Sequence, residues 1–325
     1  MSRVLVISGE DCRKLLSIEN CIPQMQKTFE QVSQGVVRQL QRAMLPTNAK
    51  NMFALMPALN EGEGIVGSKV IVFPGPGLRG KDTDDGIVPL FDSTTGQLLA
   101  IVEGKSITVI RTAAATAAAT NALARQDSSV LCILGCGKQG IAHARAICAV
   151  RPIQKLCLWD GYDNSCAAAV EQLRDLGVQI QVCPTGQQAC KDADIICTIA
   201  GASQPILMGD WVKPGAHINA VGACSPFGRE VDTKTLLRSD VFVDSTECAL
   251  RDGGDLVIPI QAGEYSKEDI KGEIGQVFLG SLPGRTSLEQ ITLFETVGIA
   301  AEDLAAAQYI YQQAVQKELG TWVNI

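Results

Sequence analysis

The sequence lacks the features of membrane, secreted and nucleic-acid-binding proteins. No apolar run reaches the roughly 18 to 20 residues that span a bilayer, and the first residues lack the pattern of a secretion signal. Lys and Arg form no cluster, and the formal net charge is -7, which is unfavourable for binding nucleic acid. We therefore expect a cytoplasmic protein with neither a membrane nor a nucleic-acid partner.

Histidine is scarce, and the cysteines are not paired in metal-binding motifs. His143 and His217 are the two histidines, and none of the 12 cysteines belongs to a CxxC pair. A zinc site or a His-based nucleophile needs more ligands or bases than this. Many cysteines lie in apolar segments such as 131–133 and 195–197, which is typical of reduced, buried thiols. We therefore expect neither a metal nor disulfides.

The pattern of apolar residues predicts two domains of different architecture. Residues 4–7 read as a strand followed by helix, and 52–103 is rich in strands, such as 66–73 and 87–91, and in turns, which indicates an α+β domain over 1–125. Over 126–303, short apolar strands alternate with helices, as in a doubly wound parallel sheet. These strands are predicted at 130–134, 155–159, 180–183, 195–198, 217–221 and 241–243. We therefore predict an α/β protein with a smaller α+β domain and a Rossmann domain. The last predicted helix, 300–319, is apolar on one face.

A glycine motif at 135–140, Gly-Cys-Gly-Lys-Gln-Gly, directly follows the predicted strand 130–134. In this context Gly135 allows a tight turn, Gly137 lets the backbone approach a pyrophosphate, and Gly140 lets helix and strand pack closely. The amino end of the following helix, predicted over 141–150, stabilises phosphate charge. The motif therefore predicts a dinucleotide site.

Asp160 ends the next predicted strand, twenty residues after Gly140. A carboxylate at this place accepts hydrogen bonds from ribose hydroxyls and repels a 2′-phosphate. Residues 161–164 contain no Arg or Lys to neutralise that phosphate. We therefore expect NAD(H) to be preferred over NADP(H). The alternative is that Asp160 caps a helix or lies in a surface turn.

Segments along the whole chain resemble the ornithine cyclodeaminase/mu-crystallin family. The segments that carry this resemblance are 56–58, 67–70, 111–117, 134–140, 209–223, 243–245, 272–275 and 297–303. The long run Gly-Asp-Trp-Val-Lys-Pro-Gly-Ala-His-Ile-Asn-Ala-Val-Gly-Ala at 209–223 is the most specific, because it is not a general Rossmann feature. The resemblance implies a homodimer formed through the first domain, with the C-terminal residues 304–325 returning to that domain.

The resemblance also implies a set of site residues. Arg42 and Lys69 would hold a substrate carboxylate, and Arg111 would lie near both the substrate and the pyrophosphate. Besides the three motif glycines and Asp160, the implied cofactor-binding residues are Lys138, Gln139, Thr83, Arg111, Thr112, Thr198, Val221, Gly222, Val297 and Gly298.

Two of the implied cations are also unusual in their local context. Lys69 interrupts the apolar strand 66–73, where a buried ammonium would cost several kcal/mol unless an anion meets it. Arg111 begins the predicted helix 111–124, where the helix dipole disfavours a cation unless an anion binds there. The alternatives to these site roles are that Lys69 lies on the solvent-exposed (wet) face of its strand and that Arg111 is exposed to solvent. The role of Arg42 in binding the carboxylate is inferred from the resemblance alone.

Two departures from the family pattern bear on the reaction. Deaminating cyclodeaminases have an Asp where this chain has Cys224, and a neutral thiol is a poor acceptor for a substrate ammonium. The imine-reducing, mu-crystallin-like branch also lacks that Asp. At 83–86 many relatives have Thr-His-Gln-Gly, whereas this chain has Asp84 and Asp85, which suggests either a substrate with a polar tail or simply an exposed acidic turn.

The sequence therefore predicts an enzyme that uses NAD(H) to reduce a C=N bond next to a carboxylate, giving a secondary or cyclic amino acid. Lys69 or Asp84 would keep the imine protonated, and the cofactor would supply the hydride. The alternatives are an amino-acid or opine-type dehydrogenase, an ornithine cyclodeaminase, and a non-catalytic crystallin-like binding protein. The sequence leaves open the imine, the direction, the proton donor and the role of Cys224.

Overall fold

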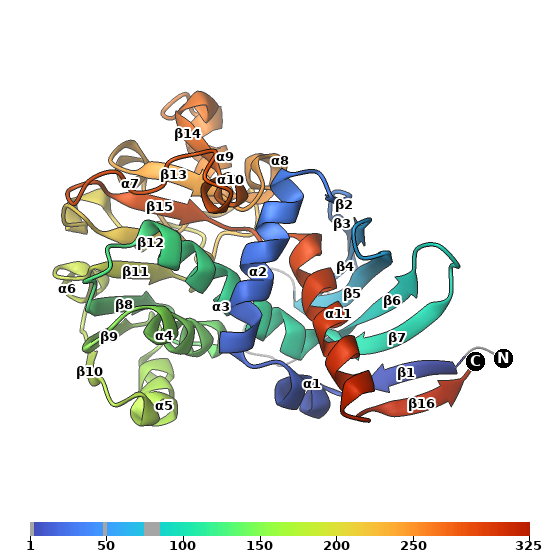
Figure 1. The fold of residues 1–325 in the computed structure, drawn as a ribbon. Coiled ribbons are helices and arrows are strands. Elements are labelled where there is room, and N and C mark those ends of the chain that lie inside the picture. Colours follow the sequence, from blue (N-terminus) through green and yellow to red (C-terminus); the bar gives the residue numbers. More distant parts are fainter. Residues whose placement is uncertain (1–2, 48–50, 75–84) are drawn as a thin grey trace. The chain divides into compact units, whose positions relative to one another are not determined.

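The computed structural model describes residues 3–47, 51–74 and 85–325 (Figure 1). Residues Thr83 and Asp84, two of the predicted site residues, lie outside these ranges. The chain divides into unit 1, Met1–Thr112 with Ile299–Ile325, and unit 2, Ala113–Gly298. The predicted division fell at 125/126 and at 303/304. The first boundary differs because helix α3 (Gly104–Leu123) is continuous and contributes residues to both units.

Unit 1 is built on a mostly antiparallel eight-stranded sheet. Its strands, in spatial order, are β16 (Thr321–Asn324), β1 (Arg3–Ile7), β7 (Leu98–Glu103), β6 (Asp85–Asp92), β5 (Ile65–Pro74), β4 (Asn51–Asn60) and β2 (Val37–Gln39), with β3 (Ala43–Pro46) paired to β4. Among these described pairs, β1 and β7 run parallel and the others antiparallel. The predicted strands 66–73 and 87–91 correspond to β5 and β6.

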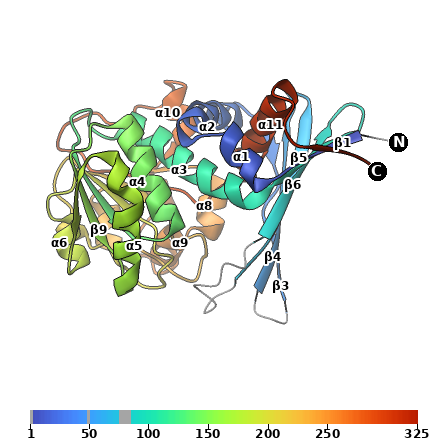
Figure 2. The ribbon, with the colours of Figure 1, turned by 90° about the horizontal axis from the view of Figure 1, so that it is seen from below.

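Three helices, α1 (Gly9–Leu15), α2 (Ile18–Ser33) and α11 (Ala300–Gln316), belong to unit 1, and α11 packs against α2 and the sheet. In Figure 2, α1 and α11 lie on one side of β4, β5 and β6. Burial alternates along β4 and β5, as expected for strands with one covered face. The single helix expected after the first strand is two helices, because Ser8 and Ser17 each cap a separate start.

Unit 2 is a Rossmann domain around a parallel eight-stranded sheet, which confirms the predicted fold class. Its strands, in spatial order, are β10 (Gln179–Val182), β9 (Lys155–Trp159), β8 (Val130–Leu134), β11 (Ile195–Thr198), β12 (His217–Ala220), β15 (Thr292–Glu295), β13 (Asp240–Val243) and β14 (Ile270–Glu273). Numbered along the chain from β8, the first five follow the 3-2-1-4-5 part of the dinucleotide-binding order, which places the topological switch point between β8 and β11. Ligands bind at the carboxyl ends of the strands beside such a point.

The helices of unit 2 alternate with these strands along the chain. They are the later part of α3, α4 (Lys138–Val150), α5 (Asp163–Leu173), α6 (Gly186–Cys190), α7 (Thr233–Leu237), α8 (Thr246–Asp252), α9 (Gly254–Gln261) and α10 (Ile274–Phe278). The central strands are buried along nearly their whole length, which explains the continuous apolar sequence of β8. None of the 12 cysteines, all of which lie in the described ranges, forms a disulfide; Cys148 is half-buried, Cys224 is exposed, and the others are buried.

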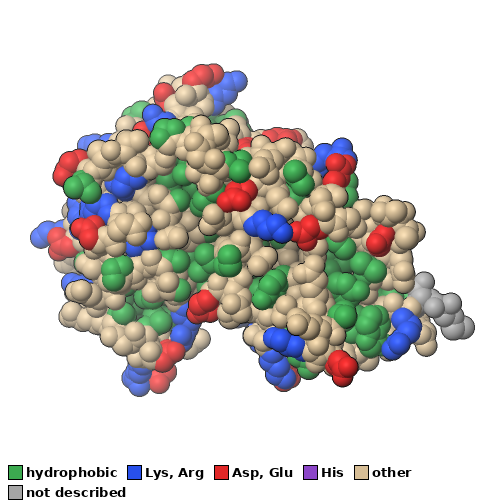
Figure 3. All heavy atoms as spheres, in the orientation of Figure 1, with side chains coloured by type: hydrophobic (Ala, Val, Ile, Leu, Met, Phe, Trp, Pro, Cys, Tyr) green, Lys and Arg blue, Asp and Glu red, His purple; other side chains and the backbone are tan. Residues whose placement is uncertain are grey.

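Helix length and surface charge bear on membrane and nucleic-acid contacts. Within the described residues, no helix combines the length and apolar character needed to cross a bilayer. On the face drawn in Figure 3, acidic and basic side chains are interspersed, and no basic patch gathers.

Candidate active site

The glycine motif forms a tight loop between β8 and α4 in unit 2. Gly135 has a φ of 112°, and a Cβ there would lie 2.6 Å from the backbone nitrogen of Ala200. A Cβ on Gly140 would lie 2.0 Å from the carbonyl oxygen of Gly135. A Cβ on Gly137, the N-cap of α4, would meet nothing within 4 Å. The first and third glycines therefore allow close backbone packing, while the second leaves room for a ligand at the amino end of α4.

Helix α4 begins inside the motif, at Lys138, three residues before the predicted start at Ile141. Lys138 and Gln139 lie on the first turn of α4, next to the open space at Gly137. The Lys138 side chain is exposed and the Gln139 side chain is partly exposed. This turn carries the backbone N–H groups that bind phosphate in dinucleotide sites.

Asp160 follows β9 and holds the glycine loop. Its Oδ2 accepts a hydrogen bond from the N–H of Cys136 at 2.7 Å, and its Oδ1 accepts one from the N–H of Tyr162 at 2.9 Å. The alternative in which Asp160 caps a helix does not apply, because α5 starts at Asp163 with Tyr162 as its N-cap. The carboxylate thus lies beside the phosphate-binding loop, where an adenosine ribose binds in Rossmann domains.

The residues after β11 and β12 lie at the same edge of the sheet as the glycine loop. Thr198 ends β11, and its carbonyl oxygen accepts the N–H groups of Val221 at 3.0 Å and Gly222 at 3.1 Å. A Cβ on Gly222 would lie 2.1 Å from the Glu230 carboxylate. Glycine is therefore required at 222 by the close packing of a buried acid.

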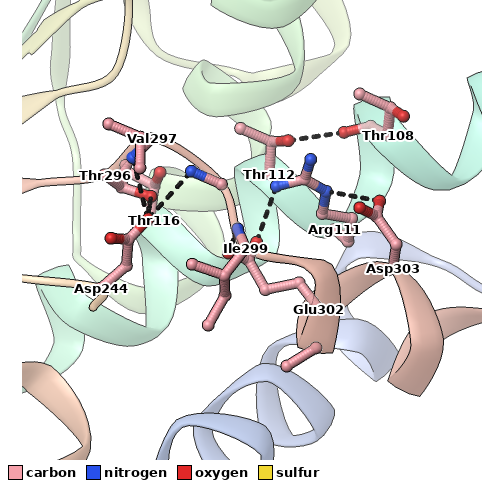
Figure 4. A network of polar contacts seen from close by, with 12 residues as sticks. Thr108, Arg111, Thr112, Thr116, Asp244, Thr296, Val297, Ile299, Glu302 and Asp303 are labelled. Atoms are coloured by element: carbon pink, nitrogen blue, oxygen red, sulfur yellow. Dashed lines mark hydrogen bonds and ion pairs between the residues drawn. The ribbon is translucent and has the colours of Figure 1, made fainter. Parts of the chain in front are cut away.

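Asp244 holds the loop that leaves β15. Its Oδ2 accepts hydrogen bonds from Thr296 Oγ1 at 2.9 Å, from the N–H of Val297 at 2.8 Å and from the N–H of Gly298 at 2.9 Å (Figure 4). The predicted cofactor residues Val297 and Gly298 thus have their backbone fixed by a buried carboxylate. Asp244 belongs to the segment 243–245 of the family resemblance, but that segment alone does not indicate this structural role.

Three further buried carboxylates, Glu230, Asp255 and Glu295, lie in unit 2. Glu230 accepts the N–H groups of Ala200 at 3.3 Å and Ala202 at 2.6 Å, and burial raises its pKa to about 7. Asp255 accepts the N–H of Glu230 at 2.6 Å, and burial raises its pKa to about 6. Burial, and then the charges of the neighbouring acids, raise the pKa of Glu295. The sequence pattern gave no signal for this cluster.

In unit 1, Lys69 lies on the helix-covered face of β5, and 3% of its side chain is exposed. Its ammonium contacts Asp303 of α11 at 2.9 Å to Oδ1 and 2.8 Å to Oδ2, and Thr108 Oγ1 at 3.4 Å. Burial lowers the pKa of Lys69 to about 8, while Asp303 opposes that shift. The alternative of a wet-face lysine is wrong. The anion that meets this ammonium belongs to the chain itself.

Arg111 is also buried and paired, but it does not begin a helix. Helix α3 starts at Gly104, because the Glu103 carboxylate accepts the N–H groups of Lys105 and Ser106. The expectation based on an N-terminal dipole was therefore wrong. Nε of Arg111 donates to Asp303 Oδ1 at 3.0 Å and Nη1 donates to Glu302 Oε2 at 2.9 Å (Figure 4).

Arg42, Lys69, Arg111, Glu302 and Asp303 form what we call the unit 1 charge cluster. Arg42 is partly exposed and near enough that its charge lowers the pKa of both Lys69 and Asp303. Burial alone would raise the pKa of Asp303, but the three cations outweigh it and the net shift is downward. Three cations therefore gather around two buried carboxylates in this cluster. Thr112 donates its hydroxyl to the Thr108 carbonyl oxygen at 2.7 Å.

The remaining candidates have clear local partners. His143 contacts the Gln139 carbonyl oxygen at 2.7 Å and Thr116 Oγ1 at 3.0 Å, and burial lowers its pKa to about 4. His217 is buried and contacts Thr292 and Asn219. Both are packed inside unit 2, as a structural role requires. The Cys224 thiol is exposed and donates to the Val221 carbonyl oxygen at 3.2 Å.

Comparison with known proteins places the chain in one family over nearly its full length. The sequence model of the ornithine cyclodeaminase/mu-crystallin family matches residues 3–318. A Delta(1)-pyrroline-2-carboxylate reductase of Bacillus cereus is 36% identical over 321 residues, 98% of each chain. The ketimine reductase mu-crystallin of Mus musculus is 35% identical over 285 residues, 87% of each chain.

A solved structure gives the same result for the fold. The Thermococcus litoralis Delta(1)-pyrroline-2-carboxylate reductase, in complex with NADH and L-proline, superposes with a TM-score of 0.94 at 31% identity. The match covers 99% of this chain and 100% of the other. The chain belongs to the ornithine cyclodeaminase/mu-crystallin family, as its sequence motifs predict.

Proposed function

We propose that this protein is an NADH-dependent reductase of cyclic 2-imino acids, which converts Δ1-pyrroline-2-carboxylate or its six-membered homologue to the corresponding cyclic amino acid. The observation that carries the proposal is the unit 1 charge cluster, in which Asp303 holds the buried cations Lys69 and Arg111 side by side, an arrangement that suits a substrate carboxylate. The names of the Bacillus and Thermococcus relatives support the same chemistry.

The loop of unit 2 fits a dinucleotide. The open space at Gly137 and the amino end of α4 would take the pyrophosphate, and Asp160 would take the adenosine ribose. The strand-end residues Thr198, Val221, Gly222, Val297 and Gly298, with Lys138, Gln139, Arg111, Thr112 and Thr83, complete the proposed contact set. Bound NADH would supply the hydride. We expect NADH to be preferred, since Asp160 would repel a 2′-phosphate.

The cations of unit 1 would bind and orient the substrate. Lys69, Arg42 and Arg111 would hold the carboxylate, which fixes the C=N carbon for hydride attack. Lys69 also carries a proton near neutral pH, and its lowered pKa suits it to donate that proton to the imine. The other candidate, Asp84, lies outside the described residues.

Cys224 distinguishes this reaction from cyclodeamination. An exposed thiol at this place gives a substrate α-ammonium no carboxylate to hydrogen-bond. Imine reduction begins from a preformed C=N bond and does not need that acceptor.

A substrate panel tests the function. Purified protein and NADH are mixed with Δ1-pyrroline-2-carboxylate or Δ1-piperideine-2-carboxylate, and NADH oxidation is followed by absorbance. Pyruvate with ammonium tests the amino-acid dehydrogenase alternative, and L-ornithine with NAD tests cyclodeamination through ammonia release. We expect fast oxidation with the cyclic imines, strongly reduced by Lys69→Ala. Ammonia and proline formed from ornithine at a comparable rate would contradict the proposal, and activity with none of the pairs would favour a non-catalytic binding protein.

We further propose that the protein forms a homodimer through the sheet of unit 1. The face of β4 and β6 opposite α11 exposes Leu55 and Ile87, at 37% and 41%. A shallow hollow beside them is lined by Phe53, Val70 and Val72. Clustered apolar side chains on a sheet face favour burial against a second copy. Light scattering should give a dimer that Leu55→Asp dissociates, whereas Leu288→Asp, at an exposed site in unit 2, should not.

We place the protein in the cytoplasm. None of its 12 described cysteines forms a disulfide, whereas disulfides form readily in secreted proteins with this many thiols. Fractionation of the source cells with an antibody against the chain tests this location.

A further inference from the structure

One carboxylate bridges the two buried cations of unit 1. Asp303 is fully buried, and its Oδ1 accepts from both Lys69 Nζ at 2.9 Å and Arg111 Nε at 3.0 Å. Glu302, the preceding residue, is equally buried, but of these two cations it contacts Arg111 alone, at 2.9 Å. Its other oxygen accepts the N–H of Ile299 at 2.9 Å and so belongs to the start of α11. The two adjacent acids of α11 therefore differ in their contacts: Asp303 bridges Lys69 and Arg111, whereas Glu302 joins Arg111 to the start of α11.

We propose that Asp303 is the positioning residue of the reductase: it holds the Lys69 ammonium charged and in place beside Arg111, so that the pair can bind the substrate carboxylate. This inference rests on the proposed function, because it assigns Lys69 and Arg111 to substrate binding. Asp303 itself does not touch the substrate. It acts through the lysine.

The surroundings of Lys69 show why a carboxylate is needed there. Burial penalises the ammonium, and the positive charges of Arg111 on α3 and of Arg42 disfavour it further. Asp303 opposes these effects by its charge and its hydrogen bond. The uncharged Thr108 hydroxyl on α3 adds a contact at 3.4 Å. On α2, the buried Cys21 has its pKa raised by burial and by Glu302, so it stays neutral. Among the described residues, Asp303 is thus the anion in contact with Lys69.

The test compares Asp303→Asn with Glu302→Gln, because each variant removes one buried carboxylate from the same turn of α11. For the wild type we expect kcat/KM for Δ1-pyrroline-2-carboxylate to fall above about pH 8, as Lys69 loses its proton. Asp303→Asn should move this alkaline limb to lower pH. It should also raise the KM by about tenfold to a hundredfold, the scale of one charge-assisted hydrogen bond. Glu302→Gln should leave the alkaline limb at the wild-type pH. It removes the carboxylate that pairs with Arg111, so its KM is allowed to rise.

A binding measurement on the NADH complex gives a readout besides turnover. Calorimetric titration with L-proline should show the same order: a weaker Kd for Asp303→Asn that worsens as the pH rises, and no such added pH dependence for Glu302→Gln. Asp303→Glu, which keeps the charge but moves it by one methylene, should keep the limb near that of the wild type and raise the KM. This variant also serves if Asp303→Asn does not fold.

Each negative result has a distinct meaning. If the wild type neither reduces the imine nor binds L-proline, the proposed function fails and not the assignment of Asp303 alone. If the wild type is active but Asp303→Asn and Glu302→Gln shift the limb equally, or neither shifts it, the positioning role of Asp303 is overturned. Asp303→Glu decides the case if Asp303→Asn does not fold. If Asp303→Glu, which keeps the negative charge, moves the alkaline limb to clearly lower pH, the positioning role is likewise overturned.

Discussion

Replacing Glu230 by glutamine should make the protein less sensitive to alkaline pH. The side chain is buried and holds the backbone of Ala200 and Ala202 after β11. Burial raises its pKa from 4.5 to about 7. An acid whose pKa is higher in the folded state than in the unfolded state contributes its full stability below pH 4.5. That stability is lost as the pH rises to about 7 and beyond.

The size of the effect follows from the shift. A rise from 4.5 to about 7 corresponds, at about 1.4 kcal/mol per unit, to a loss of roughly 3 kcal/mol in the free energy of unfolding once Glu230 is ionised. About 2 to 3 kcal/mol of that loss falls between about pH 5 and about pH 8. Glutamine has the same shape, keeps one oxygen acceptor for Ala202 and does not titrate.

Urea unfolding followed by circular dichroism, at several pH values in this window, measures the difference. Relative to the wild type, Glu230→Gln should gain about 2 to 3 kcal/mol on going from acid to alkaline pH. Glu171→Gln, at a site where 64% of the side chain is exposed, is the control and should show no such gain. If the wild type and Glu230→Gln follow parallel curves across the window, Glu230 does not carry a buried proton and the reasoning is refuted.

Three substitutions test the rest of the site. Gly140→Ala places a Cβ against the Gly135 carbonyl oxygen and should weaken NADH binding by about tenfold or more, measured by NADH fluorescence, whereas Gly161→Ala, where a Cβ meets nothing within 4 Å, should not. Asp160→Ser should narrow the preference for NADH over NADPH in kcat/KM; an unchanged ratio would remove Asp160 from the specificity determinants. Arg111→Met should cost on the order of 1.5 to 3 kcal/mol in substrate binding or transition-state stabilisation, and unchanged kinetics with an intact fold would argue against a role in the site.

The Rossmann unit was predictable because its signals are local. The strands at 130–134, 155–159 and 195–198 are short apolar runs, and they match β8, β9 and β11 residue for residue. The glycines at 135 and 140 are required by backbone contacts within a few residues or across one neighbouring strand. Strand β15 was missed, since Thr292–Glu295 is only four residues long and ends in a charged residue.

The charge cluster was predictable only in part, because its partners are distant in the sequence. The sequence indicated that Lys69 needs an anion, but Asp303 lies 234 residues away and no periodicity links the two. The helix start at Gly104 was missed because Glu103, a strand residue, supplies the cap that glycine cannot. The buried acids Glu230 and Asp255 follow no sequence pattern, because each is explained by the backbone N–H groups from which it accepts hydrogen bonds after folding.

The two ends of the chain meet in unit 1, where β1 pairs antiparallel with β16 and Arg3 lies over the ring of Trp322 at 5.0 Å (Figure 1). A ribosome therefore releases the last strand and helix α11 only after the whole of unit 2 has emerged. Residues 113–298 can begin to fold during synthesis, while residues 3–112 must wait for α11 to cover their sheet. Until then Lys69 has no Asp303 to neutralise it. A chain that stops before residue 299 would thus retain the dinucleotide loop but never assemble the charge cluster.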